Sequence, residues 1–384
     1  MSTLAPIQTG SPSSSISRTI HYLTDAPPSL ISRTIHHRTW TEWQVTFPVF
    51  PQHDNRWKRK CEQVCGSPQV VHLDLFGGQE EAGVGRSLLV NQDWEMETVI
   101  LGNDTSLPTG LQARMVTGIT MTPVYEKGRL IGRVFEDADA RYCMLGGIRP
   151  SNPAAPRGEQ AMEVFSIIQR ALQRHGMEFR HVIRTWFYLD RILDWYGEFN
   201  RVRTSFFAGI EMDVMPASTG VGAANCHGAV LSAKVIAVLP KTPGVWVQKA
   251  VSPLQGEAFA YGSAFSRAIE LCDAASRTLY ISGTASIDPD GRTLHVGDVA
   301  RQIEATMEVV EAMLDRCEMG FEDMARGIVY LKHGGDAPHW SRYCERRGLG
   351  DLPMVVTQSE VCRENLLFEI ELDAAKQQPG YLHL

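Results

Sequence analysis

Two glutamates near the C-terminus have the spacing of an acid–base pair. The segment LLFEIELDA (366–374) alternates apolar and polar residues, which predicts a strand with one buried face. Glu369 and Glu371 then share the other face of that strand. A carboxyl group in a partly apolar cleft beside a second carboxylate has a raised pKa, and such a group serves as a general acid at neutral pH. The alternative is an exposed acidic face on a sheet that is packed on one side only.

Arginines near predicted strand ends are candidates for binding a carboxylate substrate, because a guanidinium group binds a carboxylate bidentately. Arg149 ends the predicted strand RYCMLGGIRP after two glycines, and Tyr142 lies near the start of that strand. Arg267 closes the stretch YGSAFSRA, which is rich in small and hydroxyl residues and begins with Tyr261. The alternatives are a solvated surface residue for Arg149 and an interdomain salt bridge for Arg267.

A third candidate lies on a predicted helix. Arg201 and Arg203 are two residues apart in NRVRTSFF, so they cannot share one helix face. At most one of them reaches a cleft, and Arg203 is favoured.

The bulk composition indicates a soluble globular protein. The chain has 384 residues, 43% hydrophobic and 21% charged, with a formal net charge of −7. We therefore expect no nucleic-acid partner, and no apolar run approaches the roughly 20 residues that would cross a membrane. The eight cysteines have no zinc-site spacing, so we expect reduced thiols, no metal and a cytoplasmic location.

The first 40 residues differ from the rest. They are rich in Ser, Thr and Pro, contain Asp25 as their only acid, and carry ISRTIH twice, at 16–21 and 31–36. This composition predicts a disordered tail (1–40), and an organelle transit peptide is the alternative.

From about residue 137 the chain contains two similar blocks, 137–245 and 246–380. Each has a strand, a long amphipathic helix, a strand, a second helix and two closing strands. The matching steps include LGGIRP with ISGTAS and IRTWFYLD with RGIVYLK. The fold class predicted is α+β, with two β-α-β-α-β-β units whose helices cover one face of each mixed sheet. A smaller N-terminal α/β part (41–136) precedes them, and we consider it as a degenerate third unit.

The order of elements and the closing EIE resemble the RidA/YjgF superfamily, whose chorismate-mutase-like units normally form trimers with clefts between neighbouring sheets. The tandem arrangement, YGSAFSRA and PASTGVG (216–222) resemble the chorismatases, which release pyruvate from chorismate. This resemblance covers roughly residues 40–375. It implies a chorismate lyase or hydrolase of secondary metabolism that needs no cofactor.

The resemblance also implies roles for individual residues. Glu369 aligns with the acid that protonates the enolpyruvyl group, and Glu371 joins the binding residues, either raising the pKa of Glu369 or standing as a solvated neighbour. Tyr142 and Arg149 resemble a substrate-binding pair. Ala285 and Gln358 are expected as cleft walls that steer the product, a hydroxybenzoate or a dihydroxycyclohexadienoate, and which product is formed stays open.

Two other functions stay open. RidA-type imine or enamine deaminases carry an arginine two residues after a proline, and Ser218 and Val355 occupy those places here. A catalytically silent protein that binds a small acid or a partner is the second alternative. The expected partner is a small dicarboxylate substrate, and the chain is either a monomer or a homo-oligomer such as a trimer.

Overall fold

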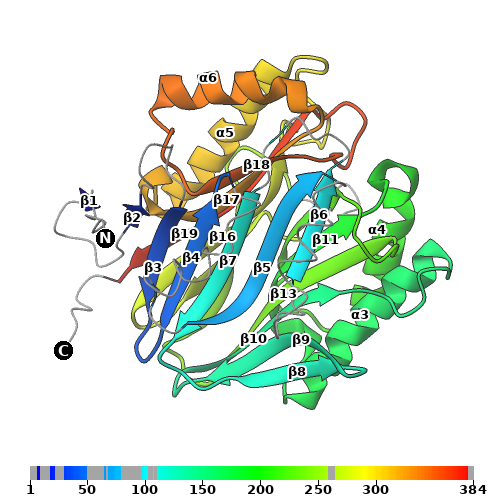
Figure 1. The fold of residues 1–384 in the computed structure, drawn as a ribbon, viewed down its shortest axis with the longest axis vertical. Helices are drawn as coiled ribbons and strands as arrows, with labels where there is room; N and C mark the ends of the chain where they lie inside the picture. The colour runs from blue at the N-terminus through cyan, green and yellow to red at the C-terminus, as the bar shows by residue number, and fades with distance from the viewer. Residues whose placement is uncertain are drawn as a thin grey trace, which may run out of the picture.

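A computed structural model of the chain describes residues 30–49, 68–78, 110–257 and 264–378, together with Cys65, Leu107 and the strands at 7–8, 18–21 and 97–102. It contains three sheets of seven, six and six strands. The described helices lie on the outer sides of two of these sheets (Figure 1). We refer to the three as the N-terminal, middle and C-terminal sheets.

The middle sheet and its helices form the first predicted unit. Its elements in chain order are β8 (Thr122–Glu126), β9 (Arg129–Glu136), β10 (Ala140–Ile148), α3 (Arg157–Arg174), η1 (Phe179–His181), β11 (Val182–Leu189), α4 (Ile192–Ala208), β12 (Ala217–Gly222) and β13 (Leu231–Pro240). The predicted apolar stripe of α3 is buried against the sheet, which confirms that helix. Helix α3 ends just before Gly176, whose φ of +69° lets the chain turn away.

The C-terminal sheet forms the second predicted unit. Its elements are β14 (Trp246–Ala250), β15 (Ala268–Cys272), β16 (Ser276–Ala285), α5 (Val299–Arg316), η3 (Phe321–Asp323), β17 (Met324–Leu331), η4 (Gly334–Asp336), α6 (Ala337–Arg347), β18 (Met354–Gln358) and β19 (Phe368–Gln377). Buried residues of α5 and α6 pack on one face of this sheet. The predicted α+β fold with two similar units is therefore confirmed.

The described residues of the N-terminal part form the third sheet. Its strands are β1 (Ile7–Gln8), β2 (Arg18–His21), β3 (Leu30–His36), β4 (Thr41–Phe47), β5 (Gln69–Gly78), β6 (Glu97–Gly102) and β7 (Gly110–Thr117). The strand order β6-β5-β7-β4-β3-β2 matches β12-β11-β13-β10-β9-β8 and β18-β17-β19-β16-β15-β14 in the other two sheets. In each sheet the first pair in this order is parallel, while the other pairs that follow are antiparallel.

Two expected boundaries change. Strand β3 falls within the expected tail, yet its apolar residues are buried in the sheet. The two ISRTIH copies pair with each other as β2 and β3. Apart from β1 and β2, the segment 1–29 lies outside the described residues. Strands β8 and β9 lie inside the expected N-terminal part (41–136), yet they pair with β10 of the middle sheet.

The inner faces of the three sheets meet in one core. Aromatic and aliphatic residues from all three sheets contribute to it, among them Trp40, Tyr142, Trp186, Tyr280 and Tyr330. Strand β19 shows how the faces divide: its apolar residues pack toward the helices, and its three acids face inward. The acidic face is therefore buried between sheets, and the alternative of an exposed acidic face is wrong.

Candidate active site

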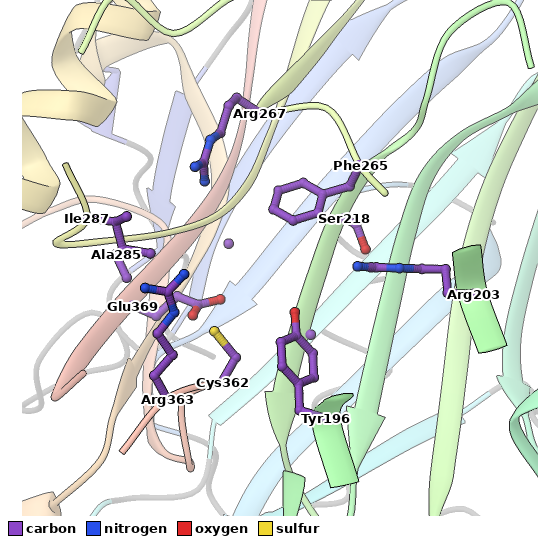
Figure 2. Close-up of a pocket in the computed structure, with 12 residues that line it drawn as sticks. Tyr196, Arg203, Ser218, Phe265, Arg267, Ala285, Ile287, Cys362, Arg363 and Glu369 are labelled. Atoms are coloured by element: carbon purple, nitrogen blue, oxygen red, sulfur yellow. The ribbon is translucent and has the colours of Figure 1, made fainter. Parts of the chain in front are cut away.

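A pocket lies where the middle and C-terminal units meet. The space between its lining residues, open mouth included, is about 520 Å³. Its walls come from α4 and β12 of one unit, and from β16, β19 and the segments that precede β15 and β19 of the other. The lining residues are Tyr196, Arg203, Ser218, Gly220, Phe265, Arg267, Gly283, Ala285, Ile287, Cys362, Arg363 and Glu369 (Figure 2).

Small residues on β16 give the carboxyl group of Glu369 its place. Ala285 is the direct cross-strand partner of Glu369 in the antiparallel pair of β16 and β19. At Gly283 a Cβ atom would collide with Oε1 of Glu369, so only glycine leaves room for the carboxyl group there. Glu369 is 4% exposed and faces the pocket (Figure 2).

Three arginines surround the pocket. Arg267 and Arg363 lie on the side of Glu369, and Arg203 lies on the opposite side (Figure 2). The ring of Phe265 stands between the two buried guanidinium groups, with its centroid 5.6 Å from Cζ of Arg267 and 5.7 Å from Cζ of Arg203. The pocket can therefore receive a molecule with a carboxylate at each end.

The surroundings of Glu369 favour its neutral form. Burial raises the pKa of Glu369, the negative charge of Glu371 raises it further, and Arg267 and Arg184 oppose the shift, so the pKa stands at about 8. A carboxyl group with this pKa is mostly protonated at neutral pH and can donate a proton.

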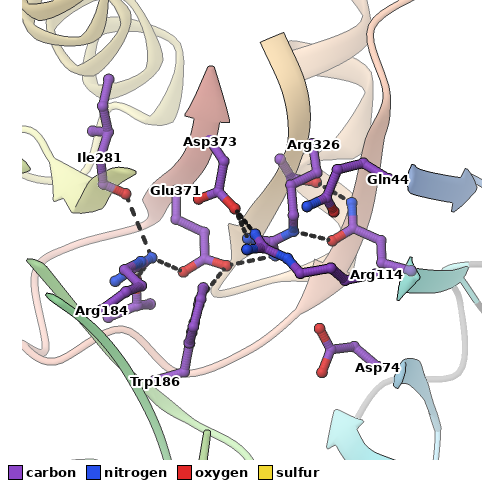
Figure 3. Close-up of polar contacts among 12 residues, drawn as sticks. Gln44, Asp74, Arg114, Arg184, Trp186, Ile281, Arg326, Glu371 and Asp373 are labelled. Carbon is purple, nitrogen blue, oxygen red and sulfur yellow. Dashed lines mark hydrogen bonds and ion pairs between the residues drawn. The ribbon is translucent and has the colours of Figure 1, made fainter. Parts of the chain in front are cut away.

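Glu371 has the opposite surroundings. Its carboxylate accepts hydrogen bonds from Arg184 Nη2 at 2.7 Å, Arg326 Nη2 at 2.8 Å and Trp186 Nε1 at 2.8 Å (Figure 3). Burial alone would raise the pKa of Glu371, but Arg184, Arg326 and Lys234 lower it to about 2. Glu371 is therefore ionised. Its negative charge raises the pKa of Glu369, which is one of the two roles that the sequence left open for Glu371.

Two further pocket residues remain protonated at neutral pH. Burial is the main cause that raises the pKa of the Tyr196 phenol to about 12. Burial, followed by the charge of Glu369, raises the pKa of the Cys362 thiol to about 12 as well. Both groups can donate hydrogen bonds to a bound molecule, and neither is a ready anionic nucleophile.

Four of the predicted site residues line this pocket: Glu369, Arg203, Arg267 and Ala285. Tyr261 lies outside the described residues. Three others lie elsewhere and require correction: Tyr142 stacks on Phe135 in the inner core, Gln358 donates to the carbonyl of Lys332, and Glu371 belongs to the ion-pair network.

Arg149 is the fourth correction, and its position has a topological reason. It follows β10, whose Ile148 pairs with Ala233, just as Ala285 follows Thr284, which pairs with Ile370 on β19. Arg149 therefore occupies in the middle sheet the place of Ala285 in the C-terminal sheet. Strand β10 borders β5 and β6 of the N-terminal sheet, so Arg149 lies at a different junction.

Five lining residues with functional side chains were missed from the sequence: Tyr196, Ser218, Phe265, Cys362 and Arg363. Phe265 lies within YGSAFSRA, and Ser218 lies within PASTGVG, so the motifs were found but not these side chains. Cys362 and Arg363 precede the acidic strand by a few residues, and no pattern in that segment indicates which side chains turn inward.

The described residues gather no group of three or more His, Cys, Asp or Glu side chains that could hold a metal ion. None of the helices that the structure describes is long and apolar enough to cross a membrane.

Comparisons with known proteins agree with this picture. The chain is 30% identical over 211 residues to a chorismatase of Streptomyces rapamycinicus, an alignment that covers 49% of this chain and 62% of that relative. It is 25% identical over 263 residues to a 3-hydroxybenzoate synthase of Streptomyces hygroscopicus, covering 61% of this chain and 74% of the relative. The match to the first relative thus spans less than two thirds of that protein's length.

A solved structure shows the same fold. A chorismatase crystal structure at 1.08 Å resolution superposes with a TM-score of 0.62 at 20% sequence identity, covering 81% of this chain and 96% of that one. No family model matches the chain.

Proposed function

We propose that this chain, a homologue of the chorismatases with their fold, is an enzyme that releases pyruvate from chorismate. The observation that carries this proposal is the pocket itself. Its acid is largely neutral at pH 7, it contains three arginines, and its walls come from both units. Homology to a chorismatase and to a 3-hydroxybenzoate synthase supports the substrate class.

The proposed reaction begins with proton transfer from Glu369 to the methylene carbon of the enolpyruvyl ether. The ether carbon then becomes an oxocarbenium ion, which water or the ring hydroxyl can attack. Addition of water followed by cleavage of the C–O bond yields pyruvate and a dihydroxycyclohexadienoate. Without net uptake of water the same atoms yield pyruvate and a hydroxybenzoate. General-acid catalysis of this kind accelerates a reaction by roughly 10²–10⁴.

The arginines divide between the two carboxylates of chorismate. Arg267 and Arg363 lie on the side of Glu369, so we assign them to the enolpyruvyl carboxylate, next to the carbon that is protonated. Arg203 lies across the pocket and suits the ring carboxylate. Because ionic binding orients both ends, the methylene carbon meets the acid in one geometry. The reaction requires no cofactor.

The test mixes the purified chain with chorismate and follows pyruvate release, with product analysis by chromatography. Glu369→Gln keeps the shape of the side chain and removes the proton donor, so turnover should fall by at least about 10². Glu364→Gln is the matched control, because Glu364 is an exposed acid in the segment before β19.

Three outcomes separate the candidate functions. Turnover that depends on Glu369 supports the proposal. Hydrolysis of 2-aminoacrylate without chorismate turnover favours a deaminase, although Ser218 and Val355 occupy the places where RidA-type deaminases carry their arginine. If the chain shows neither activity, a binding protein is favoured.

We also propose that the N-terminal sheet is a degenerate third unit around a pseudo-threefold axis, which supports a monomer. The shared strand order of the three sheets is the basis for this proposal. A cytoplasmic location is supported by the seven described cysteines, all of which are free thiols.

A further inference from the structure

The motif PASTG supplies the strand that joins the two units behind the pocket. The backbone N–H of Ser218 donates to Oγ of Ser282 at 2.8 Å, and Ser282 Oγ in turn donates to the carbonyl of Ser266 at 2.6 Å. Ala217 forms an isolated bridge with Ser266. Strand β12 is thus fixed to the C-terminal unit at the level of Glu369, and Thr219 is the next residue along it.

The hydroxyl oxygen of Thr219 accepts two hydrogen bonds. Its Oγ1 accepts from Arg184 Nη2 at 2.8 Å and from the backbone N–H of Gly283 at 3.0 Å. A hydroxyl oxygen has two acceptor sites and one proton to donate. Both acceptor sites are therefore taken, and Arg184, one of the two donors, also donates to Glu371 at 2.7 Å. Thr219 is 1% exposed, so water does not compete for these bonds.

Through Arg184, Thr219 is connected to the charge of Glu371. The carboxylate of Glu371 accepts from three side-chain N–H groups, those of Arg184, Trp186 and Arg326. A carboxylic acid would need an acceptor for its own proton, and every one of these three neighbours is a donor. The negative charge is therefore held on Glu371.

Thr219 also occupies donors that lie close to Glu369. Gly283 lies so close to Glu369 that a Cβ atom there would collide with the carboxyl group, and its N–H group donates to Thr219. Arg184 acts on Glu369 through its charge, and one of its N–H groups is likewise held by Thr219. A donor released from Thr219 would be available to an ionised Glu369 and would stabilise that form.

We propose that Thr219 is a positioning residue that keeps the proton of the carboxyl pair on Glu369, by accepting the N–H group of Gly283 and one N–H group of Arg184. This inference rests on the proposed role of Glu369 as the acid and adds a residue from the neighbouring unit to its control. Charged and titratable groups that face Glu369 from the packed elements are Glu371, Tyr330, Arg184, Tyr196, Arg203, Arg267, Cys362 and Arg363. Thr219 binds one of them, Arg184, and carries no charge itself.

The experiment compares Thr219→Val, which keeps the shape but removes the hydroxyl, with Thr219→Ser, which keeps the hydroxyl. Thr306→Val is the matched control, because Thr306 is a fully buried threonine on α5 whose hydroxyl donates to the Gln302 carbonyl. Infrared spectra over a pH series follow the carbonyl band of the protonated Glu369 carboxyl group, which is identified by its loss in Glu369→Gln. This measurement requires no substrate.

We expect the Glu369 band of Thr219→Val to disappear at a pH about one unit lower than in the unchanged protein. Thr219→Ser and Thr306→Val should retain the original midpoint. With chorismate, kcat of Thr219→Val should fall about twofold at pH 7 and about tenfold at pH 9 while KM changes little, because the basic limb of the pH profile should move with the infrared midpoint.

An unchanged midpoint in folded Thr219→Val, or an equal shift in Thr306→Val, would overturn the inference. If the midpoint shifts but no variant, nor the original chain, turns over chorismate, then the inference on Thr219 holds and the proposed substrate is wrong. A destabilised but spectroscopically normal Thr219→Val would show a merely structural role and would also overturn it.

Discussion

Glu369 and Glu371 are the same side chain two residues apart on one strand, yet their surroundings give them opposite charges at neutral pH. Glu371 accepts hydrogen bonds from two guanidinium groups and an indole N–H, so it stays ionised. Glu369 faces a pocket beside that fixed negative charge, so it keeps its proton. Environments that separate the pKa values of two titratable groups in this way are a mark of acid–base catalysis.

The raised pKa of Glu369 should make the fold less stable as the pH rises from acidic to alkaline values. The pKa of Glu369 is raised to about 8 in the folded chain, against about 4.3 for a glutamate in an unfolded chain. The folded state binds the proton more tightly, so its contribution to stability is complete below about pH 4 and is lost as pH rises through about 8. We predict that Glu369→Gln removes this loss and is more stable than the original chain at alkaline pH, by a few kcal/mol at most.

Urea unfolding at about pH 5 and about pH 8.5 measures the effect. The stability difference between Glu369→Gln and the original chain should grow with pH. Glu364→Gln, on the exposed side chain, should show no such trend. A difference for Glu369→Gln that is equal at both pH values would contradict the raised pKa.

At the scale of elements, the pocket depends on how closely β16 approaches β19. Gly283 is the residue that permits this approach, because a Cβ atom there would collide with Glu369 and would lie 3.3 Å from Cγ2 of Thr219. We predict that Gly283→Ala displaces the carboxyl group of Glu369 and lowers kcat by about 10² or more, with a loss of stability of about 1–3 kcal/mol from overpacking.

The matched control is Gly335→Ala, since a Cβ atom at Gly335 meets nothing within 4 Å. Turnover assays and thermal unfolding of both variants separate the effects. If Gly283→Ala folds and turns over as fast as Gly335→Ala, the close packing of β16 against the acid has no role in the reaction.

The sequence predicted the elements better than it predicted the site. The repeated order of strands and helices could be read from periodicity, because each amphipathic helix and strand carries its own pattern. Which unit faces which neighbour does not appear in any local pattern. Arg149 was therefore expected beside Glu369, although the strand that it follows, β10, belongs to the middle sheet and not to the sheet of Glu369. Thr219 and Ser218, from the strand that does border the pocket, were seen only as a motif.

At the scale of the whole molecule, buried ion pairs cross every junction between sheets. Arg114 of β7 pairs with Asp373 of β19 at 2.7 Å, and Arg184 of β11 pairs with Glu371 of β19 at 2.7 Å. Lys234 of β13 pairs with Asp74 of β5. Buried pairs are poor sources of net stability, but breaking one leaves a charge without a partner, so they specify one mutual arrangement of the three sheets.

The three sheets also have matching positions for the acid. Strands β5, β11 and β17 occupy equivalent places in the three sheets. Each has a register shift in its antiparallel pairing, after Val70, Val182 and Met324 respectively. Counted from that shift, the residues opposite Phe76, Tyr188 and Tyr330 occupy the same place. Those residues are Gly110, Ser232 and Glu369, so the described strands carry an acid at one of the three places.

We therefore predict one substrate-like ligand per chain. At the matching junction of Gly110, a Cβ atom would collide with the side chain of Val355, so that place is filled. Titration calorimetry with 3-hydroxybenzoate should give a stoichiometry of one, and Arg203→Gln should weaken that single event by about 10-fold or more, because a charge-assisted hydrogen bond is lost. Two or three equal binding events per chain would contradict the assignment of a single functional junction.

The presence of Gly110, Ser232 and Glu369 at one repeated position has a consequence for how such a molecule can change over generations. In an assembly of identical subunits every substitution occurs in all copies at once, so a residue at one junction cannot change without changing the same residue at every other junction. Fusion of the repeats into one chain removes that constraint. The junctions at Gly110 and Ser232 can then change independently, while the junction at Glu369 keeps the acid and takes Thr219 and Arg203 from the middle unit.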